Sequence, residues 1–222
     1  MHDQLINLIA FTFTAGLLMM APGLDTVLVI RTATAEGGRA AMGVVGGICC
    51  GVLVWGLAAA FGFTALVAAS PLAFNILKVA GALYLVWLGL QLIGKSCRAL
   101  AQPGDLLGGV TPPGKGRQPA AGLWRSWRVG FMSNLLNPGF GLVVLTLFPQ
   151  FVPAHAPVAH SMMVLTCVQV AIAAAWFGLL AAVGLPLGRL LARPVVVRWF
   201  DILTGVVFLL FAAQLALAHA PH

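Results

Sequence analysis

The sequence predicts an all-α integral membrane protein with six transmembrane helices, arranged as two inverted three-helix repeats. Three observations lead to this prediction. Of 222 residues, 61% are hydrophobic and only 8% are charged, against roughly 25% charged residues in an ordinary soluble domain. The mean hydropathy is +1.02, and the apolar residues form runs that approach or exceed the length of about 20 residues needed to cross a bilayer. The basic residues gather in the links between these runs.

The predicted spans are separated by short links except at the centre of the chain. They cover residues 5–30, 40–69, 72–93, 129–151, 161–187 and 199–217. Between the third and fourth spans lies a stretch that is rich in Pro and Gly, carries scattered Lys and Arg, and has no apolar period, as is typical of a flexible loop. We therefore divide the chain into a first repeat (1–93), a basic cytoplasmic loop (94–124) and a second repeat (125–222).

The positions of the basic residues predict the orientation in the bilayer. Every Lys and Arg except Lys78 lies in or beside the links after the first, third and fifth spans. The positive-inside rule then places these links in the cytoplasm and both termini outside. Because each half contains three spans, the halves must cross in opposite directions, as in many secondary transporters. The basic residues form no stripe, so we expect no nucleic-acid partner.

A helix break is predicted in the first span at Pro22 and Gly23, immediately before Asp25. Proline removes a helical hydrogen bond, and a break at membrane depth is tolerated only beside protein or a water-filled cavity. An acidic residue there is costly and usually marks a functional site. Asp25 is therefore a candidate for substrate binding or ion coupling. The alternative is that it only caps the adjoining helical turns, close to Arg31 and to water.

The fourth span repeats this pattern, because Asn134 and Asn137 precede a break at Pro138-Gly139. Broken helices with polar groups form the central binding sites of many transporters. In the third span, Lys78 is the one basic residue placed inside a span. Its side chain either extends to the nearer membrane surface or lines the transport path, and the sequence leaves both open.

A glycine face is predicted on the second span. Gly43, Gly47 and Gly51 follow one another at four-residue spacing, which allows close approach of another helix inside a membrane. That helix belongs either to the same chain or to a second copy, so a homodimer is possible.

Several motifs follow one another in order along nearly the whole chain. They are Pro22-Gly23-Leu24-Asp25, Gly38-Arg39, Gly46-Gly47, the run from Lys78 to Gly89, Gly130-Phe131, the run from Asn134 to Pro138, and the run from Phe148 to Phe151. Together they resemble the LysE/RhtB family of amino-acid exporters. That resemblance implies six helices and export of amino acids or their derivatives across the bacterial inner membrane. It also implies that an ion gradient drives export, and we expect the ion to be the proton. Leu24 and Gly139 replace a proline and a lysine that are common in the family, and these departures concern the substrate more than the fold.

An amino acid carries an ammonium and a carboxylate, so its site needs an anion for one and donors for the other. We expect Asp25 to bind the ammonium or to carry the coupling proton. Asn134 and Asn137, with backbone amides freed at Pro138-Gly139, are expected to hold the carboxylate. Lys78 is a second candidate for the carboxylate, or a partner for Asp25.

Other chemistry finds little support in the sequence. Cys49 and Cys50 are adjacent and Cys97 and Cys167 stand alone, so no pair has the spacing of a redox or zinc site. There is no phosphate-binding loop or nucleotide motif, which argues against an ATP-driven pump. We therefore expect neither an enzyme nor a bound cofactor or metal. The alternative function is export of another small solute or of a metal ion.

Overall fold

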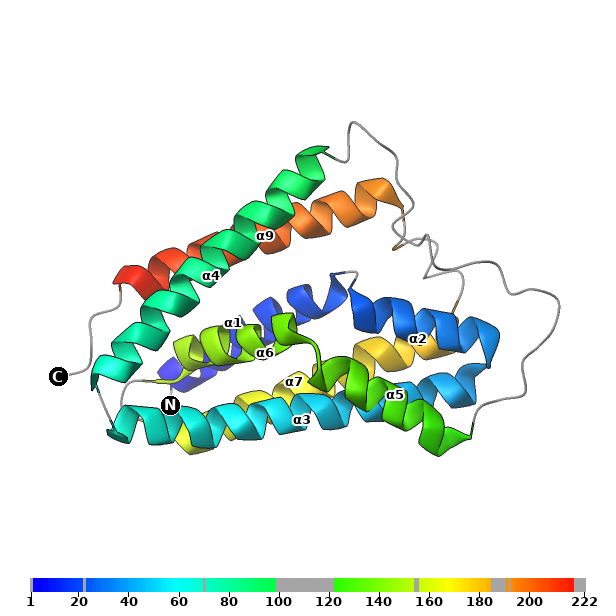
Figure 1. Ribbon diagram of the computed structural model, residues 1–222, viewed down its shortest axis with the longest axis horizontal. Helices are drawn as coiled ribbons and strands as arrows, with labels where there is room; N and C mark the ends of the chain where they lie inside the picture. The colour runs from blue at the N-terminus through cyan, green and yellow to red at the C-terminus, as the bar shows by residue number, and fades with distance from the viewer. Residues whose placement is uncertain are drawn as a thin grey trace.

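The structure is a computed structural model that describes residues 2–21, 23–69, 71–98, 122–153, 156–184, 191 and 193–217. Within these ranges every regular element is a helix, as predicted. The helices are α1 (His2–Met20), α2 (Leu24–Ala35), α3 (Gly38–Ala69), α4 (Pro71–Arg98), α5 (Leu123–Leu135), α6 (Pro138–Leu147), the 3₁₀ helix η1 (Phe148–Phe151), α7 (Val158–Val183) and α9 (Pro194–Leu217). Figure 1 shows how they are arranged.

Two of the predicted spans are bent at a break. Helices α1 and α2 meet at an angle of 58°, and α5 meets the segment formed by α6 and η1 at 59°. The breaks lie where the sequence predicts them, beside Gly23 and at Asn137, although Pro22 itself lies outside the described residues. Proline at the start of the second segment of a pair is compatible with a new helix but not with continuation of the old one.

Among the described residues, three helices, α3, α7 and α9, are long and apolar enough to cross a membrane. Counting each bent pair as one further span gives up to five, and α4 contributes a shorter apolar helix, Val79–Gly94. The chain is thus a helical membrane protein, while the count of six spans stays a prediction. In the described residues each half contains a bent pair followed by two long helices, but the inverted two-fold relation between the halves also stays a prediction.

Several helix ends differ from the predicted ones. Helix α4 continues to Arg98, past the expected boundary at residue 93, because a single glycine, Gly94, does not end a helix. Helix α5 already begins at Leu123, directly after Gly122, so the predicted loop 94–124 is too long at both ends; its residues 99–121 lie outside the described ranges. Helix α7 ends at Val183, since Gly184 adopts a positive φ of 59°.

The glycine face of α3 packs against α5 of the same chain. A Cβ atom on Gly43 would lie 3.0 Å from the side chains of Leu123 and Ser126. A Cβ on Gly47 would overlap the carbonyl oxygen of Trp127, and one on Gly51 would come within 2.6 Å of Asn134 Oδ1. At these three positions α3 and α5 therefore approach closely. Of the two alternatives for the partner of this face, the structure shows the helix of the same chain, α5; a homodimer stays a prediction.

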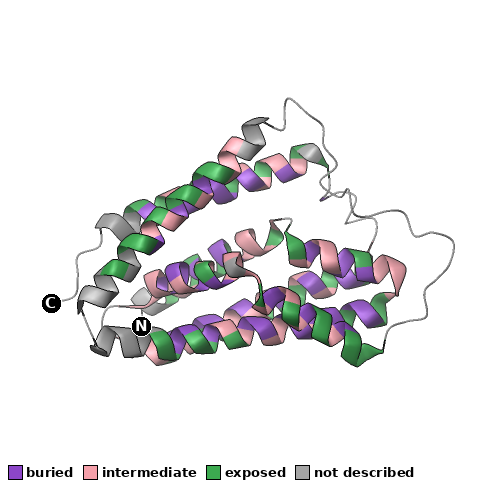
Figure 2. Cartoon of the chain, in the orientation of Figure 1, coloured by how far each residue is buried: buried purple, intermediate pink, exposed green. Residues whose placement is uncertain are grey.

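Helices α4 and α9 form a second close pair, which Figure 1 shows beside the remaining helices. A Cβ on Gly89 would lie 2.8 Å from the carbonyl oxygen of Gly205, and a Cβ on Gly205 would lie equally near that of Gly89. The outward side of α4 is apolar and exposed (Figure 2), with Leu83 65% and Trp87 55% exposed. Such a surface suits contact with lipid acyl chains.

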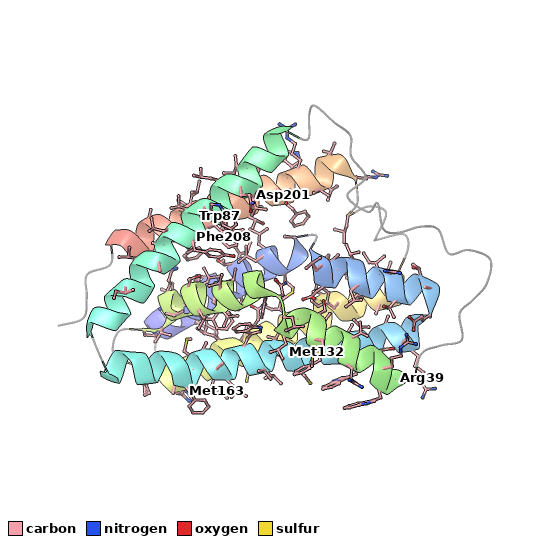
Figure 3. The ribbon with its side chains drawn as sticks, in the orientation of Figure 1. Arg39, Trp87, Met132, Met163, Asp201 and Phe208 are labelled. Carbon is pink, nitrogen blue, oxygen red and sulfur yellow. The ribbon has the colours of Figure 1, made fainter. Side chains whose placement is uncertain are left out.

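The arginines at the ends of several helices lie at one end of the molecule. In Figure 1 the first turns of α3, α5 and α9 lie at the end opposite to the start of α1 and the close of α9. Arg39 and Arg125 lie in these turns, Arg128 and Arg198 follow in the second turns of α5 and α9, and Figure 3 labels Arg39 at this end. The arrangement agrees with the grouping of basic residues on one side that the sequence shows.

Candidate functional site

The two helix breaks meet at Asp25. Its Oδ2 accepts a hydrogen bond of 2.9 Å from Asn134 Nδ2, and its Oδ1 accepts one of 3.1 Å from Ser133 Oγ. Asp25 lies in the first turn of α2, whereas Ser133 and Asn134 lie in the last turn of α5, just after Met132, which Figure 3 labels. Each oxygen of the carboxylate thus binds a neutral donor from the other half of the chain. Asp25 and Asn134, two predicted site residues, are brought together.

Asn134 occupies the centre of this arrangement. Its side chain is buried, with 1% exposed, while Asp25 and Ser133 are partly exposed. Since Gly51 has no side chain, the amide of Asn134 fits against α3; a Cβ on Gly51 would crowd Oδ1, Cβ and Cγ of Asn134 together. The close packing of α3 on α5 therefore also fixes the side chain that donates to Asp25.

Asn137 caps the helix that begins after the second break. Its Oδ1 accepts hydrogen bonds from the backbone amides of Gly139, at 3.1 Å, and Phe140, at 3.4 Å. It is the N-cap of α6, and Pro138 occupies the first helical position, where its missing N–H leaves no helical bond unmade. The two amides are thus already paired, which corrects the expectation that they lie free at the break. A contact of Asn137 with substrate stays a prediction.

Replacing Asn137 with Ala is expected to lower the free energy of unfolding by about 1 kcal/mol, because two amides at the start of α6 lose their acceptor. The measurement is the melting temperature of the purified protein in detergent. Asn137→Asp keeps an acceptor oxygen and is the matched control. Equal melting temperatures for the Ala variant and the native protein would contradict the capping role.

The remaining predicted site residues are Gly23, Lys78 and Pro22. Gly23 is the exposed N-cap residue of α2, with φ −128°, and the nearest atom to a Cβ there would be 3.9 Å away, so the backbone does not require glycine. Lys78 belongs to α4, but its side chain is not among the described ones. Pro22 lies outside the described residues. A pairing of Lys78 with Asp25 therefore stays untested.

Two residues at the site were missed in the sequence. Ser133 directly precedes Asn134 and is likewise polar at the predicted break. Trp55 donates a long hydrogen bond, 3.4 Å, from Nε1 to the main-chain oxygen of Asn134. Its position was signalled by the spacing alone, because it follows Gly43, Gly47 and Gly51 at the next four-residue step on the same helix face.

Among the described residues, no three His, Cys, Asp or Glu side chains come together in a group that could hold a metal ion. The oxygens and amides at the breaks are suited to a polar organic ligand. A carboxylate flanked by hydroxyl and amide groups can bind an ammonium, and an acid of this kind can also exchange a proton.

Comparisons with known proteins agree with the motifs. A family model described as LysE type translocator matches residues 17–219. An uncharacterized membrane protein of Vibrio cholerae is 32% identical over 213 residues, covering 96% of this chain and 97% of that protein. The threonine efflux protein of Escherichia coli is 27% identical over 201 residues, 90% of this chain and 92% of that protein. The homoserine/homoserine lactone efflux protein of Salmonella typhimurium is 32% identical over 148 residues, 67% and 66% of the two chains. No solved structure gave a significant match.

Proposed function

The chain belongs to the LysE type translocator family, and from this premise we propose that it is a secondary active exporter of amino acids or their derivatives from the bacterial cytoplasm. Relatives named for efflux of threonine and of homoserine and its lactone support this substrate class. These compounds share an ammonium group, whereas the lactone has no free carboxylate. Recognition of the ammonium is therefore the common requirement that a site for such substrates has to meet.

The observation that carries the proposal is the carboxylate of Asp25 at the junction of two helix breaks, bound by Ser133 and Asn134. An ionised carboxylate offers about four acceptor positions, and these two donors occupy two of them. The donors hold the carboxylate in place and leave it its negative charge, since both are neutral. An ammonium group, with three N–H donors, is the complementary ligand.

Proton coupling follows from competition at the same group. A proton and a substrate ammonium both bind to the carboxylate of Asp25, and binding of one weakens binding of the other. If the proton enters from outside and the amino acid from the cytoplasm, the protein acts as an antiporter in the inner membrane. Asn137 and Lys78 are the candidates for the substrate carboxylate. The cluster of arginines at one end of the molecule supports a cytoplasmic position for that end and an outside position for both termini.

The test is uptake of labelled threonine and labelled homoserine into inside-out vesicles that contain the protein, with and without a proton gradient. Inverted vesicles turn export into accumulation. We expect accumulation that depends on the gradient and disappears when a protonophore is added, with empty vesicles as the control. The proposal is wrong if vesicles with intact, inserted protein accumulate neither these compounds nor any other amino acid. Another small solute or a metal ion then becomes the candidate substrate.

A further inference from the structure

One side chain of α3 contacts both sides of the α5–α6 break. The indole Nε1 of Trp55 donates to the main-chain oxygen of Asn134 in the last turn of α5. Its ring lies directly over Gly141 in α6, where a Cβ would overlap the ring carbons. The ring also packs against the apolar cluster that contains Val144 and Leu147 of α6. Trp55 therefore connects the two segments whose junction presents Ser133 and Asn134.

The carbonyl group that Trp55 binds has lost its helical donor. In an uninterrupted helix the oxygen of Asn134 would accept from the amide of residue 138, but residue 138 is proline and has no N–H. The oxygen instead accepts from the backbone amide of Asn137, at 3.1 Å, and from Trp55, at 3.4 Å. The indole is thus a second donor, beside the amide of Asn137, to an oxygen that Pro138 cannot bind.

We propose that Trp55 is a positioning residue for the amino-acid site. Its N–H fixes the main chain of Asn134, the side chain of Asn134 donates to Asp25, and the carboxylate of Asp25 binds the substrate. This inference rests on the proposed function. It differs from a purely packing role in one respect: the apolar ring accounts for contact with the cluster and with Gly141, whereas only the N–H reaches Asn134.

The test separates the N–H from the ring. Trp55→Phe keeps an aromatic ring but removes the N–H. Trp176→Phe is the matched control, because the indole nitrogen of Trp176 is also buried but has no hydrogen-bond partner in the described part of the chain. Initial rates of threonine or homoserine accumulation in inside-out vesicles give KM and kcat, and melting in detergent gives the stability. For Trp55→Phe we expect KM to rise about five- to tenfold, the range that one hydrogen bond supports, with a melting temperature like that of Trp176→Phe.

A second variant acts on the same contact from the other side. Gly141→Ala pushes the ring of Trp55 away from α6, and its effect on KM should be in the same direction as that of Trp55→Phe. In the double variant the two effects should not add, because both act through the same hydrogen bond.

The possible results distinguish the positioning role of Trp55 from the proposed function of the protein. Transport by Trp55→Phe with the kinetics of Trp176→Phe, while transport still depends on Asp25, would overturn the positioning role alone. A loss of transport matched by an equal fall in stability would also overturn it, since that is the result of a structural role. Absence of any transport that depends on Asp25 would overturn the proposed function, and the positioning role with it.

Discussion

Replacing Asp25 with Asn is expected to reduce export of amino acids at least about 30-fold while the protein still inserts into the membrane. Asn has nearly the same shape but no negative charge, so in the proposed mechanism the substrate ammonium loses its counter-ion and the coupling proton loses its binding group. Loss of one partner of a partly buried charge pair costs about 2–5 kcal/mol, which corresponds to a change of this size or larger. Accumulation in inside-out vesicles and the amount of inserted protein are the two measurements.

Glu36→Gln is the matched control for this variant. Glu36 follows the last residue of the same helix, α2, and is its C-cap, so the substitution removes the same charge away from the helix break. We expect it to leave export in place. Normal export by Asp25→Asn would remove Asp25 from the mechanism, whereas loss of export in both variants would indicate a general effect of charge on α2.

Replacing Gly47 with Ala is expected to have the largest effect on stability. The added methyl group would overlap the main-chain oxygen of Trp127 and lie 2.6 Å from the main-chain nitrogen of Phe131. Backbone atoms cannot move aside as a side chain can, so α3 and α5 must separate. Overpacking usually costs about 1–3 kcal/mol, and for contacts with the main chain of α5 we expect a loss at the upper end of that range or beyond it. The yield of folded protein and its melting temperature in detergent measure the effect.

Gly62→Ala tests whether that effect comes from the helix contact. Gly62 lies on the same helix and is exposed, and a Cβ added there would have no other atom within 4 Å. Alanine at this position should leave the stability unchanged or raise it, because alanine favours a helix over glycine by roughly 1 kcal/mol. Equal losses in both variants would mean that the glycine face does not determine the packing of α5.

The sequence predicted the features that depend on local backbone chemistry. The breaks beside Gly23 and before Pro138 follow from the geometry of proline and glycine, and the close packing of Gly43, Gly47 and Gly51 follows from their spacing. The helix ends at Arg98 and Leu123 were not predicted, since Pro and Gly composition marks a loop only approximately. The number of spans and the inverted relation of the halves stay predictions. The first depends on where the bilayer lies, and the second depends on a symmetry between the two halves.

The candidate site was predicted in part for a similar reason. Asp25 and Asn134 stand out as polar residues beside breaks, but their hydrogen bond depends on how α3 places α5 against α2, which no local pattern reports. Asn137 was assigned to the substrate although a local rule, the preference for Asn at an N-cap before proline, describes its position better. Trp55 was missed because its polar contact is a single N–H on an otherwise apolar side chain.

The most direct test of the central claim, that Asp25 binds the substrate ammonium, is competition by an analogue that lacks this group. Export of the labelled amino acid is measured in the presence of the unlabelled amino acid or of the analogue in which a hydroxyl replaces the amino group. In the native protein we expect the amino acid to compete far better than the analogue. In Asp25→Asn, measured by binding to the purified protein, this preference should disappear, because the charge that creates it is gone. A preference for the amino acid that persists unchanged in Asp25→Asn would contradict the claim and place the ammonium at another group.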